Sequence, residues 1–448
     1  MLYNQFLERL VLPAGDFVFR SRYAAELRAW RRCTRMSSDE VDALQARRLA
    51  SMLAYAREHI PYYRDFAIAH DDDARRLLAR FPLLSKTTVK SQLDRFVHPG
   101  ASNLDVEFSS GSSGVQGKVF LNQAAQSISR AATTHIWEWA GFRLGENLLQ
   151  LGMGEKRPFK KRLKDRFFRV DYELAFKLSE SEIRRVLEKN RHRKSLFFVG
   201  YASALYTFAQ VANRHGLGFP CMAVVSFGDK MFDHYRREIQ AAFSCKVYNT
   251  YGATEGFVIA GECEAGRLHI LSPHVVIEVL DGEGRPAPPG EMGRVHVTTL
   301  DNFAMPLIRY SLGDLVTLED PIARCSCGRP YPMLRTIIGR DTDIVATPAG
   351  QKLIVHFFTA IFEYYSSIRQ FKVVQRTIAG IEIQYIPDTG FQPHLLNEIE
   401  GKIRAKLDGE SFQIAFRVVD EIRPAPSGKP QIIESRIASQ ALAAGVSS

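Results

Sequence analysis

Hydrophobic residues in the first part of the chain recur at helical spacing. Between residues 2 and 80, Ala, Leu and Arg return every three or four positions, most clearly over residues 42–58. This spacing predicts amphipathic helices. The dipeptide Ile60-Pro61 is expected to end the longest one, because the residue before a proline is driven out of the helical region.

From residue 107 onward the pattern changes to short apolar runs that alternate with helical stretches. A helix is predicted over residues 126–139, and strands over residues 106–108, 148–151, 196–199, 222–227 and 245–248. Alternating strands and helices predict an α/β architecture with a largely parallel sheet. The uncharged stretch 195–213 carries Ser, Thr, Gln and Asn and the break Gly200-Tyr201, so it predicts a strand and a helix rather than a membrane span.

Two further patterns of apolar and polar residues follow toward the C-terminus. Runs at 269–270, 275–280, 294–299 and 315–318, punctuated by Gly and Pro, predict a β subdomain over about residues 262–338. Strand and helix patterns at 355–365, 371–375, 381–385, 393–407 and 412–419 predict a compact α+β unit after Gly339-Arg340. We therefore expect two domains, residues 1–340 and 341–448.

Composition narrows the class of protein. Of 448 residues, 46% are apolar and 24% charged, values that exclude disordered, collagenous and small disulfide-stapled chains. Asn4, Gln5 and Glu8 interrupt the first apolar residues, so no secretory signal is predicted and a cytoplasmic location is expected. Disulfides are then not expected among the six cysteines. The net charge of +10 favours anionic partners such as nucleotides, acidic carrier proteins or membrane surfaces.

A Gly/Ser-rich segment follows the predicted strand at 106–108. Small residues let backbone amides and hydroxyls converge on phosphate oxygens. The segment is not a Walker loop, because the glycine spacing is one residue too long and Val119 stands where Ser or Thr is required. A plain surface loop remains the alternative. The candidate phosphate ligands are Ser109, Ser110, Gly111, Ser112, Ser113 and Gly114.

A second candidate segment comes directly after the run at 245–248. In its Tyr-Gly-x-Thr-Glu core, Tyr251 can stack on a flat heterocycle, Thr254 can donate to a phosphate, and Glu255 can hold a divalent cation. A strand end followed by a helix cap is the alternative.

Three more residues complete the candidate chemistry. Asp314 in an Arg-Tyr-x-x-Gly-Asp segment can accept from ribose hydroxyls, although Gly-Asp is also a common turn. Arg340 at the predicted domain boundary and Lys429 on a Pro/Gly/Ser loop suggest positioned cations. Solvated surface charge is the alternative for both.

The order and spacing of these segments resemble those of the adenylate-forming superfamily of acyl-CoA synthetases and adenylation domains. Further segments are similar to the phenylacetate-CoA ligase branch, which includes relatives linked to capsular polysaccharide and coenzyme modification: His59-Ile60-Pro61-Tyr62-Tyr63-Arg64, Phe81-Pro82-Leu83-Leu84-Ser85-Lys86, Glu262-Cys263, Leu268-His269-Ile270 and Cys325-Ser326-Cys327-Gly328-Arg329. The resemblance extends over residues 49–429. It implies a large N-terminal adenylate-forming domain, with parallel α/β layers and the β subdomain, and a small mobile C-terminal α+β domain.

The resemblance also implies roles. The 109–114 loop would hold the β- and γ-phosphates of ATP, while Tyr251 and Gly252 would lie against adenine. Thr254 would contact the α-phosphate and Glu255 would hold Mg²⁺. Asp314 would bind the ribose and Arg340 the phosphate or ribose. Lys429 would reach the acid carboxylate and the α-phosphate during adenylation.

This sequence departs from the family pattern at three places. Val115 and Gln116 follow the loop glycine where Lys or Pro is usual, and Thr342-Asp343 replaces the Asp-Asp of the hinge expected at 341–343. Gly228-Asp229 stands in place of a common Gly-Glu.

The implied activity is ATP-dependent ligation of an acid, possibly aromatic, to a thiol of coenzyme A or of a carrier-protein phosphopantetheine. Two alternatives stay open: transfer to an amine, hydroxyl or cofactor, and a degenerate member that binds nucleotide without turnover. The acid pocket is expected between residues 227–230, residues 251–255 and the helix near His135 and Trp137. A homodimer is a family-level expectation, and nucleic-acid binding is not expected.

A separate hypothesis concerns a metal. Cys-x-Cys-Gly and Cys-x5-His are two short segments with spacings typical of zinc ligands, and the resemblance places both in the β subdomain. Three thiolates and one imidazole would fill the four tetrahedral positions of a structural zinc ion. Buried free cysteines are the alternative. The candidate ligands are Cys263, His269, Cys325 and Cys327.

The basic run 155–169 holds eight Lys or Arg against two acids. A solvated helix face and a docking patch for an acidic carrier protein or coenzyme A phosphates are the two interpretations.

Overall fold

The structure is a computed structural model of the chain. It describes residues 2–66, 71–108, 118–153, 158–176, 178–253, 256–340, 343–349, 351–362, 364–365, 367–405, 407, 411–423, 431–435 and 437.

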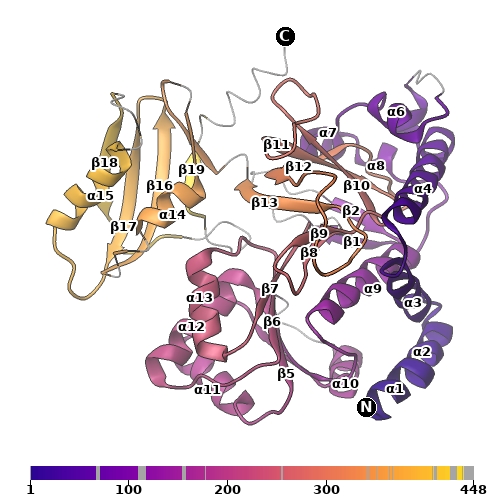
Figure 1. Cartoon of the computed structure of the whole chain (residues 1–448), viewed down its shortest axis with the longest axis horizontal. Helices are drawn as coiled ribbons and strands as arrows, with labels where there is room; N and C mark the ends of the chain where they lie inside the picture. The colour runs from indigo at the N-terminus through magenta and orange to yellow at the C-terminus, as the bar shows by residue number, and fades with distance from the viewer. Residues whose placement is uncertain are drawn as a thin grey trace.

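One large mixed sheet organises the body of the molecule, as Figure 1 shows. Five strands, β4, β3, β5, β6 and β7, run parallel, and from β8 onward each strand pairs antiparallel with its neighbour. In spatial order the strands are β10 (Val275–Leu280), β11 (Met292–Thr299), β12 (Tyr310–Leu318), β13 (Met333–Arg340), β9 (Leu268–Ile270), β8 (Phe257–Glu262), β7 (Val247–Ala253), β6 (Ala223–Phe227), β5 (Leu196–Tyr201), β3 (Asn147–Gly152) and β4 (Val170–Leu174).

Helices cover both faces of the parallel part, and its central strands β5 and β6 are almost entirely apolar and buried. In β5, Leu196 and Phe198 face one hydrophobic core, while Phe197 and Val199 face the other, as the two-residue period of a strand requires. The helices of the first face are α11 (Glu180–Asn190), α12 (Ala202–His215) and α13 (Asp233–Phe243); those of the second are α3 (Tyr23–Cys33) and α9 (Gln123–Trp139).

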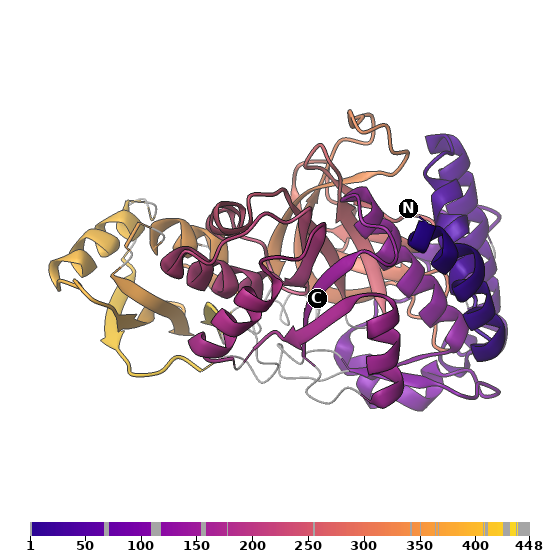
Figure 2. The same cartoon turned by 90° about the horizontal axis from the view of Figure 1, so that it is seen from below.

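The N-terminal helices pack at the end of the molecule opposite the C-terminal unit, as Figure 2 shows. The longest, α4, begins at a capping box of Ser37 and Glu40 and ends at His59, one residue before Ile60-Pro61. Its apolar face joins a core shared with the antiparallel strands. The remaining elements are α1 (Leu2–Phe6), the π-helix η1 (Leu7–Val11), α2 (Leu12–Phe19), α4 (Ser38–His59), α5 (Pro61–Arg64), α6 (Ala74–Ala79), α7 (Lys86–Ser91), α8 (Leu93–Phe96), β1 (Asp105–Phe108), β2 (Lys118–Leu121) and α10 (Phe159–Phe167).

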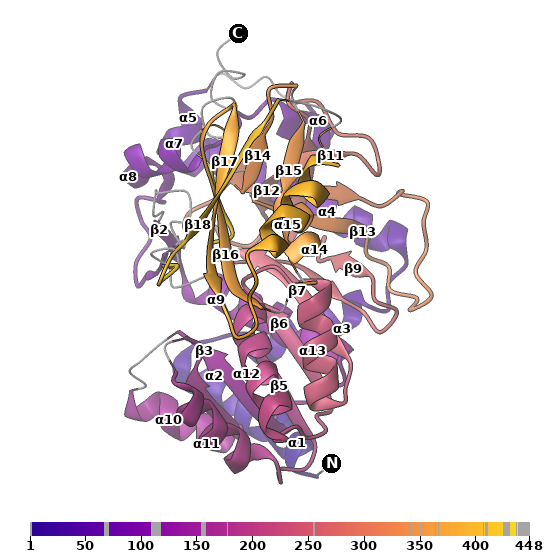
Figure 3. The ribbon, with the colours of Figure 1, turned by 90° about the vertical axis from the view of Figure 1, so that its left-hand side faces the viewer.

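The C-terminal elements form their own sheet and core, seen from the front in Figure 3. Four strands lie in the order β18-β17-β16-β19, and β14 and β15 form a separate hairpin. The core includes Phe358, Ile383 and Ile399, and it also takes in Phe232 from the body. The elements are β14 (Ile344–Ala346), β15 (Lys352–Ile354), α14 (Val355–Phe362), β16 (Ile368–Thr377), β17 (Gly380–Pro387), α15 (His394–Arg404), β18 (Gln413–Val418) and β19 (Ile433–Ser435).

Two candidate segments differ from their expected local structure. Residues 248–253 lie within β7 rather than after a strand, because β7 continues into a hairpin with β8, which the sequence pattern does not indicate. Gly313-Asp314 is not an isolated turn but part of β12, where Gly313 has a φ of 74° next to a register irregularity. Positive φ is accessible to glycine at little cost, so a turn-like dipeptide is accommodated inside a strand.

Among the residues described, no helix has both the length and the apolar character needed to cross a membrane.

Candidate functional site

A cavity of about 440 Å³ lies between the ends of β6 and β7, the antiparallel strands and the C-terminal unit. Ligands of α/β sheets bind outside the carboxyl ends of the strands, which is where β6 and β7 open here. Its walls come from four places: the loop after β6 (Gly228, Asp229, Lys230, Met231, Phe232, Asp233), β7 (Asn249, Thr250, Tyr251, Gly252), β12 and β13 (Asp314, Thr336, Ile337, Ile338, Gly339, Arg340), and the C-terminal unit (Asp343, Ile354, Val355, Gln431, Ile432).

Asp314 is the centre of the polar wall. It lies directly opposite Arg340 in the pairing of β12 with β13, and Arg340 Nε is 3.0 Å from Asp314 Oδ1. The Tyr251 hydroxyl donates to Asp314 Oδ2 at 2.8 Å, and Arg340 Nη1 donates to the Leu312 carbonyl at 2.9 Å. Three residues predicted separately from sequence therefore meet in one hydrogen-bonded group. Each carboxylate oxygen keeps further acceptor capacity for a ligand hydroxyl.

Two predicted glycines allow close approach of backbone at the cavity wall. A β-carbon at Gly228, whose φ is 82°, would lie 2.5 Å from the Tyr201 ring. A β-carbon at Gly252 would lie 2.5 Å from the Phe257 carbonyl oxygen, which is fixed in the β7–β8 hairpin. Any larger side chain would therefore displace the wall of the cavity.

Lys230 is a cavity residue to which the sequence patterns assign no role. Its Nζ donates to the Ile338 carbonyl at 2.6 Å and lies 5.4 Å from the Phe232 ring centroid. Burial lowers the pKa of Lys230 to about 8. Only its place in the 227–230 segment, where an acid pocket was expected, pointed to it.

The carboxylate of the neighbouring Asp229 stabilises the start of a helix. It accepts hydrogen bonds from the backbone amides of Ala202 and Ser203, at 2.6 and 3.2 Å, at the start of α12. Its carboxylate thereby caps a helix whose own N-cap position, Tyr201, offers no side-chain acceptor.

His135 and Trp137 are not among the described residues that line the cavity. His135 is buried, with its Nε2 2.8 Å from the Thr34 hydroxyl and its ring 6.0 Å from that of Trp30. Trp137 packs edge-on against Phe142. Both side chains serve the core between α3, α9 and the sheet.

The other candidate residues lie outside the described residues. These are the phosphate-loop residues Ser109, Ser110, Gly111, Ser112, Ser113 and Gly114, together with Thr254, Glu255 and Lys429. Their roles stay predictions.

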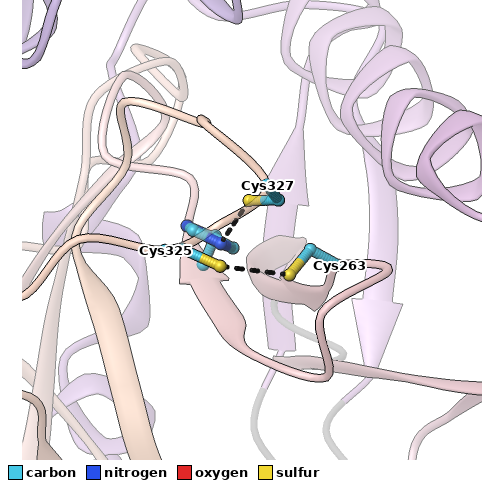
Figure 4. A group of neighbouring side chains, drawn as sticks. Cys263, Cys325 and Cys327 are labelled. Carbon is cyan, nitrogen blue, oxygen red and sulfur yellow. Dashed lines mark hydrogen bonds between the residues drawn. The ribbon is translucent and has the colours of Figure 1, made fainter.

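Three cysteines and a histidine converge in the antiparallel part of the sheet (Figure 4). Cys263 Sγ lies 3.7 Å from Cys325 Sγ, and Cys327 Sγ lies 3.2 Å from His269 Nε2. All four ligand atoms lie within 4.8 Å of one another. Zn–S bonds of about 2.3 Å at tetrahedral angles separate two sulfurs by roughly 3.8 Å, so this spacing fits a zinc ion.

The surroundings of the cluster favour metal binding. His269 Nδ1 lies 3.1 Å from the Tyr331 carbonyl, which only accepts, so Nδ1 carries the proton and Nε2 keeps its lone pair toward the sulfurs. Burial lowers the pKa of His269 and keeps the imidazole neutral. At Cys327, burial opposes ionisation, but hydrogen bonds from Arg329, Cys325 and Cys263 together outweigh it and lower the pKa of the thiol. The described residues thus provide four ligands and a partner that orients the histidine.

Comparisons with known proteins agree with this architecture. A family model described as the CapK C-terminal domain matches residues 345–436. Protein CapK of Staphylococcus aureus is 21% identical over 96% of this chain and 97% of its own length. The phenylacetate-coenzyme A ligase of Thermus thermophilus is 27% identical over 68% of this chain and 72% of the ligase.

Among solved structures, 2-hydroxyisobutyryl-CoA ligase in its postadenylation state, in complex with R3-HIB-AMP, gives a TM-score of 0.71 at 20% identity. That comparison covers 93% of this chain and 94% of the ligase. The same ligase in its thioesterification state, with 2-HIB-AMP and CoA, gives 0.58 over the same shares of both chains. These likenesses confirm the predicted fold class and the resemblance to the phenylacetate-CoA ligase branch of the adenylate-forming superfamily.

Proposed function

We propose that this chain uses ATP to activate a carboxylic acid as an acyl adenylate and then transfers the acyl group to a thiol of coenzyme A or of a carrier-protein phosphopantetheine. The observation that carries the proposal is the joining of Tyr251, Asp314 and Arg340 in one wall of the cavity. Relatives that match two thirds of the chain are acid–coenzyme A ligases, which confirms the prediction of an enzyme of this class.

The cavity suits a nucleotide in size and in polarity. Its volume of about 440 Å³ falls within the range of small-molecule sites, and its wall combines an aromatic ring, a buried carboxylate and a guanidinium. In the proposal, Tyr251 and Gly252 border the adenine, Asp314 accepts from the ribose hydroxyls, and Arg340 contacts the ribose or a phosphate. The Arg340 contact holds the Asp314 carboxylate in place before ATP arrives.

The proposed reaction has two steps. A carboxylate oxygen of the acid attacks the α-phosphorus of ATP, and pyrophosphate leaves; a thiolate then attacks the acyl carbon, and AMP leaves. Lys429 and Thr254 are proposed to stabilise the negative charge that gathers on the α-phosphate. When bound, Mg²⁺ would neutralise phosphate charge, and Glu255 is the proposed ligand.

The sequence positions of these groups relative to the cavity support their roles. Gln431, which lines the cavity, is two residues from Lys429, and Gly252, also a lining residue, is three residues from Glu255. β1 and β2, paired at Phe108 and Lys118, flank the 109–114 loop in the sequence.

The second step is proposed to need a movement of the C-terminal unit about residues 341–343. The likeness to one ligase in two states supports this, because the score is 0.71 for the postadenylation state and 0.58 for the thioesterification state. The hydrogen bond from Lys230 to the Ile338 carbonyl joins the loop after β6 to β13, the strand just before that hinge.

For the Cys/His cluster we propose a structural zinc site. Four protein ligands leave no position for water or substrate, so the metal would stabilise the fold and take no part in acid activation. The fit of the 3.7 Å sulfur separation to tetrahedral zinc supports this choice over free buried thiols.

Transfer of the acyl group to an amine, hydroxyl or cofactor is the alternative to a thiol acceptor. The relative that matches nearly the whole chain is Protein CapK, whereas the relatives named as coenzyme A ligases match about two thirds of it. Incubating the protein with ATP, Mg²⁺ and a panel of aryl, arylacetic and fatty acids, with and without coenzyme A, separates the two. Acid-dependent AMP release that rises with coenzyme A and gives a thioester supports the thiol acceptor. AMP release without thioester supports the alternative, and no acid-dependent AMP release contradicts the proposal.

A further inference from the structure

Helix α10 presents a stripe of large apolar side chains to solvent. Phe159, Leu163 and Phe167 are 78%, 52% and 47% exposed, and their spacing of four residues places them on one side of the helix. Every residue of α10 whose side chain is described is exposed or half-buried. A helix of this length normally owes its stability to a packed apolar face.

In the part of the chain that the structure describes, the body of the protein does not cover this stripe. The helix is anchored at its end, where Phe168 packs against the core of α3 and α9 and β4 begins at Val170. The side chains that would ordinarily be buried are therefore exposed, and α10 itself contacts the edge strand β4. Figure 3 shows α10 at the outer margin of the parallel part of the sheet.

Cations flank the stripe on both sides. At about 100° per residue, Arg162 and Arg166 lie along one edge of the apolar side and Lys164 along the other. All three are exposed. Long cationic side chains beside an apolar face can extend their charged ends toward anionic groups while their stems stay on apolar surface.

The N-terminal helix extends the same surface. The Tyr3 hydroxyl donates to the Phe167 carbonyl at 2.6 Å, and the Arg169 guanidinium lies 4.4 Å from the Tyr3 ring centroid. Tyr3 in turn contacts Phe6, which is exposed, as is Leu10 one turn further on. Apolar side chains thus continue from α10 onto α1 and η1, with the Arg169 guanidinium between them.

We propose that α10, together with α1 and η1, docks the protein on the surface of an anionic phospholipid bilayer. Apolar side chains on one side of a helix, flanked by Lys and Arg, form the pattern of helices that lie in the interface of a membrane. A bilayer offers anionic headgroups to both edges of the stripe at once and takes up protruding aromatic rings between them. An acidic carrier protein would match the cations, but it would need a groove shaped to three protruding apolar side chains. This inference does not rest on the reaction proposed above.

The test is co-sedimentation of the purified full chain with vesicles of phosphatidylcholine alone and of phosphatidylcholine with phosphatidylglycerol. We expect binding to the anionic vesicles, reduced by salt, and little binding to the neutral ones. Replacing Phe159, Leu163 and Phe167 together by Ala should lower the partition coefficient tenfold or more, by order of magnitude. The double change Arg162→Gln/Arg166→Gln should lower it about fivefold for each cation removed.

Matched changes elsewhere serve as controls. Ile322→Ala/Ile378→Ala/Val418→Ala removes three exposed apolar side chains, and Arg376→Gln/Arg417→Gln removes the same charge, all far along the chain from α10. Both controls should bind as the unchanged protein does. Because the replaced α10 side chains are exposed, the thermal melting temperature should change little, which excludes loss of folding as the cause.

Three results would overturn the inference. One is equal binding to neutral and anionic vesicles, and another is an equal loss in the control variants. The third is absence of vesicle binding while an acyl carrier protein binds in a manner that depends on Arg162 and Arg166, which would assign the surface to a carrier.

Discussion

The cavity and the Cys/His cluster are both built from residues distant in the sequence, but they hold their polar groups in different ways. In the cavity, Asp314, Arg340 and Lys230 are paired with one another or with backbone and still face an open volume of about 440 Å³. In the cluster, the three sulfurs and one nitrogen point at each other with no space between them for a substrate. The arrangement in the cavity suits a ligand that binds and leaves, and the arrangement in the cluster suits a metal ion that stays bound.

This difference predicts opposite responses to substitution. Changes in the cavity should alter ligand binding or catalysis more than stability, and changes in the cluster should alter stability more than catalysis per folded molecule. The predictions below test that division.

The largest effect is expected for Lys429→Ala. Loss of a cation that stabilises transition-state charge should reduce adenylation about 10³-fold, while thioester formation from supplied acyl adenylate stays close to normal. The measurement is the rate of each half-reaction, with Lys402→Ala, a lysine of α15, as control. An equal loss in both half-reactions would show that Lys429 has a different role.

Cys325→Ser should come next, and its effect should fall on stability. Removing one of four ligands is expected to lower the zinc content and to cost about 3 kcal/mol of unfolding free energy, while adenylation at low temperature is retained. Cys221→Ser, a buried cysteine outside the cluster, is the control because it should leave the metal content unchanged. Metal-free unaltered protein with full stability would end the zinc proposal.

Asp314→Asn should weaken ATP binding by roughly tenfold to thirtyfold. It removes the charge that pairs with Arg340 and leaves an amide opposite the Tyr251 hydroxyl, at a cost typical of a charge-assisted hydrogen bond, about 2 kcal/mol. Tyr251→Phe, which removes only the hydroxyl, should weaken binding less. The measurement is the Kd for ATP by calorimetry, and equal effects of the two variants would contradict this order.

The smallest expected effect concerns the pH dependence of stability at Lys230. Burial lowers the pKa of this lysine from 10.5 to about 8, so between these values the unfolded chain binds more protons than the folded one. The stability contributed by this group therefore rises as pH increases through that window. Relative to Lys230→Met, the unaltered protein should gain about 1 kcal/mol of unfolding free energy between about pH 8.5 and about pH 9.5. Parallel pH profiles of the two proteins would contradict the buried, perturbed state of the lysine.

Much of the architecture was predictable from the sequence, because the apolar residues of many helices and strands are arranged in a pattern typical of that element. The predicted strand at 275–280 matches β10, because these residues form an apolar run rich in valine and isoleucine, and the helix at 126–139 falls within α9, because its buried positions recur at helical spacing. β8 was missed although residues 257–260 form an apolar run, and its pairing with β7 and β9 identifies it as a strand. The short β19 was missed because three residues carry too little pattern.

Of the candidate site, the sequence indicated residue types but not their pairing. The 25 residues between Asp314 and Arg340 give no sign that the two lie opposite one another across β12 and β13. Nor could the pattern show that Asp229 caps α12 or that Lys230 reaches the Ile338 carbonyl, because both contacts depend on how the loop after β6 meets other elements. The cluster was more predictable, since its two arms have short internal spacings typical of metal sites.

The central claim is that this chain forms an acyl adenylate, and ATP–pyrophosphate exchange tests it most directly. The assay uses the purified protein with Mg²⁺, labelled pyrophosphate and one acid at a time from the aryl, arylacetic and fatty classes. We expect exchange that depends on one class of acid and is lost in Lys429→Ala. Absence of acid-dependent exchange with every class, in protein that binds ATP measurably, would contradict it.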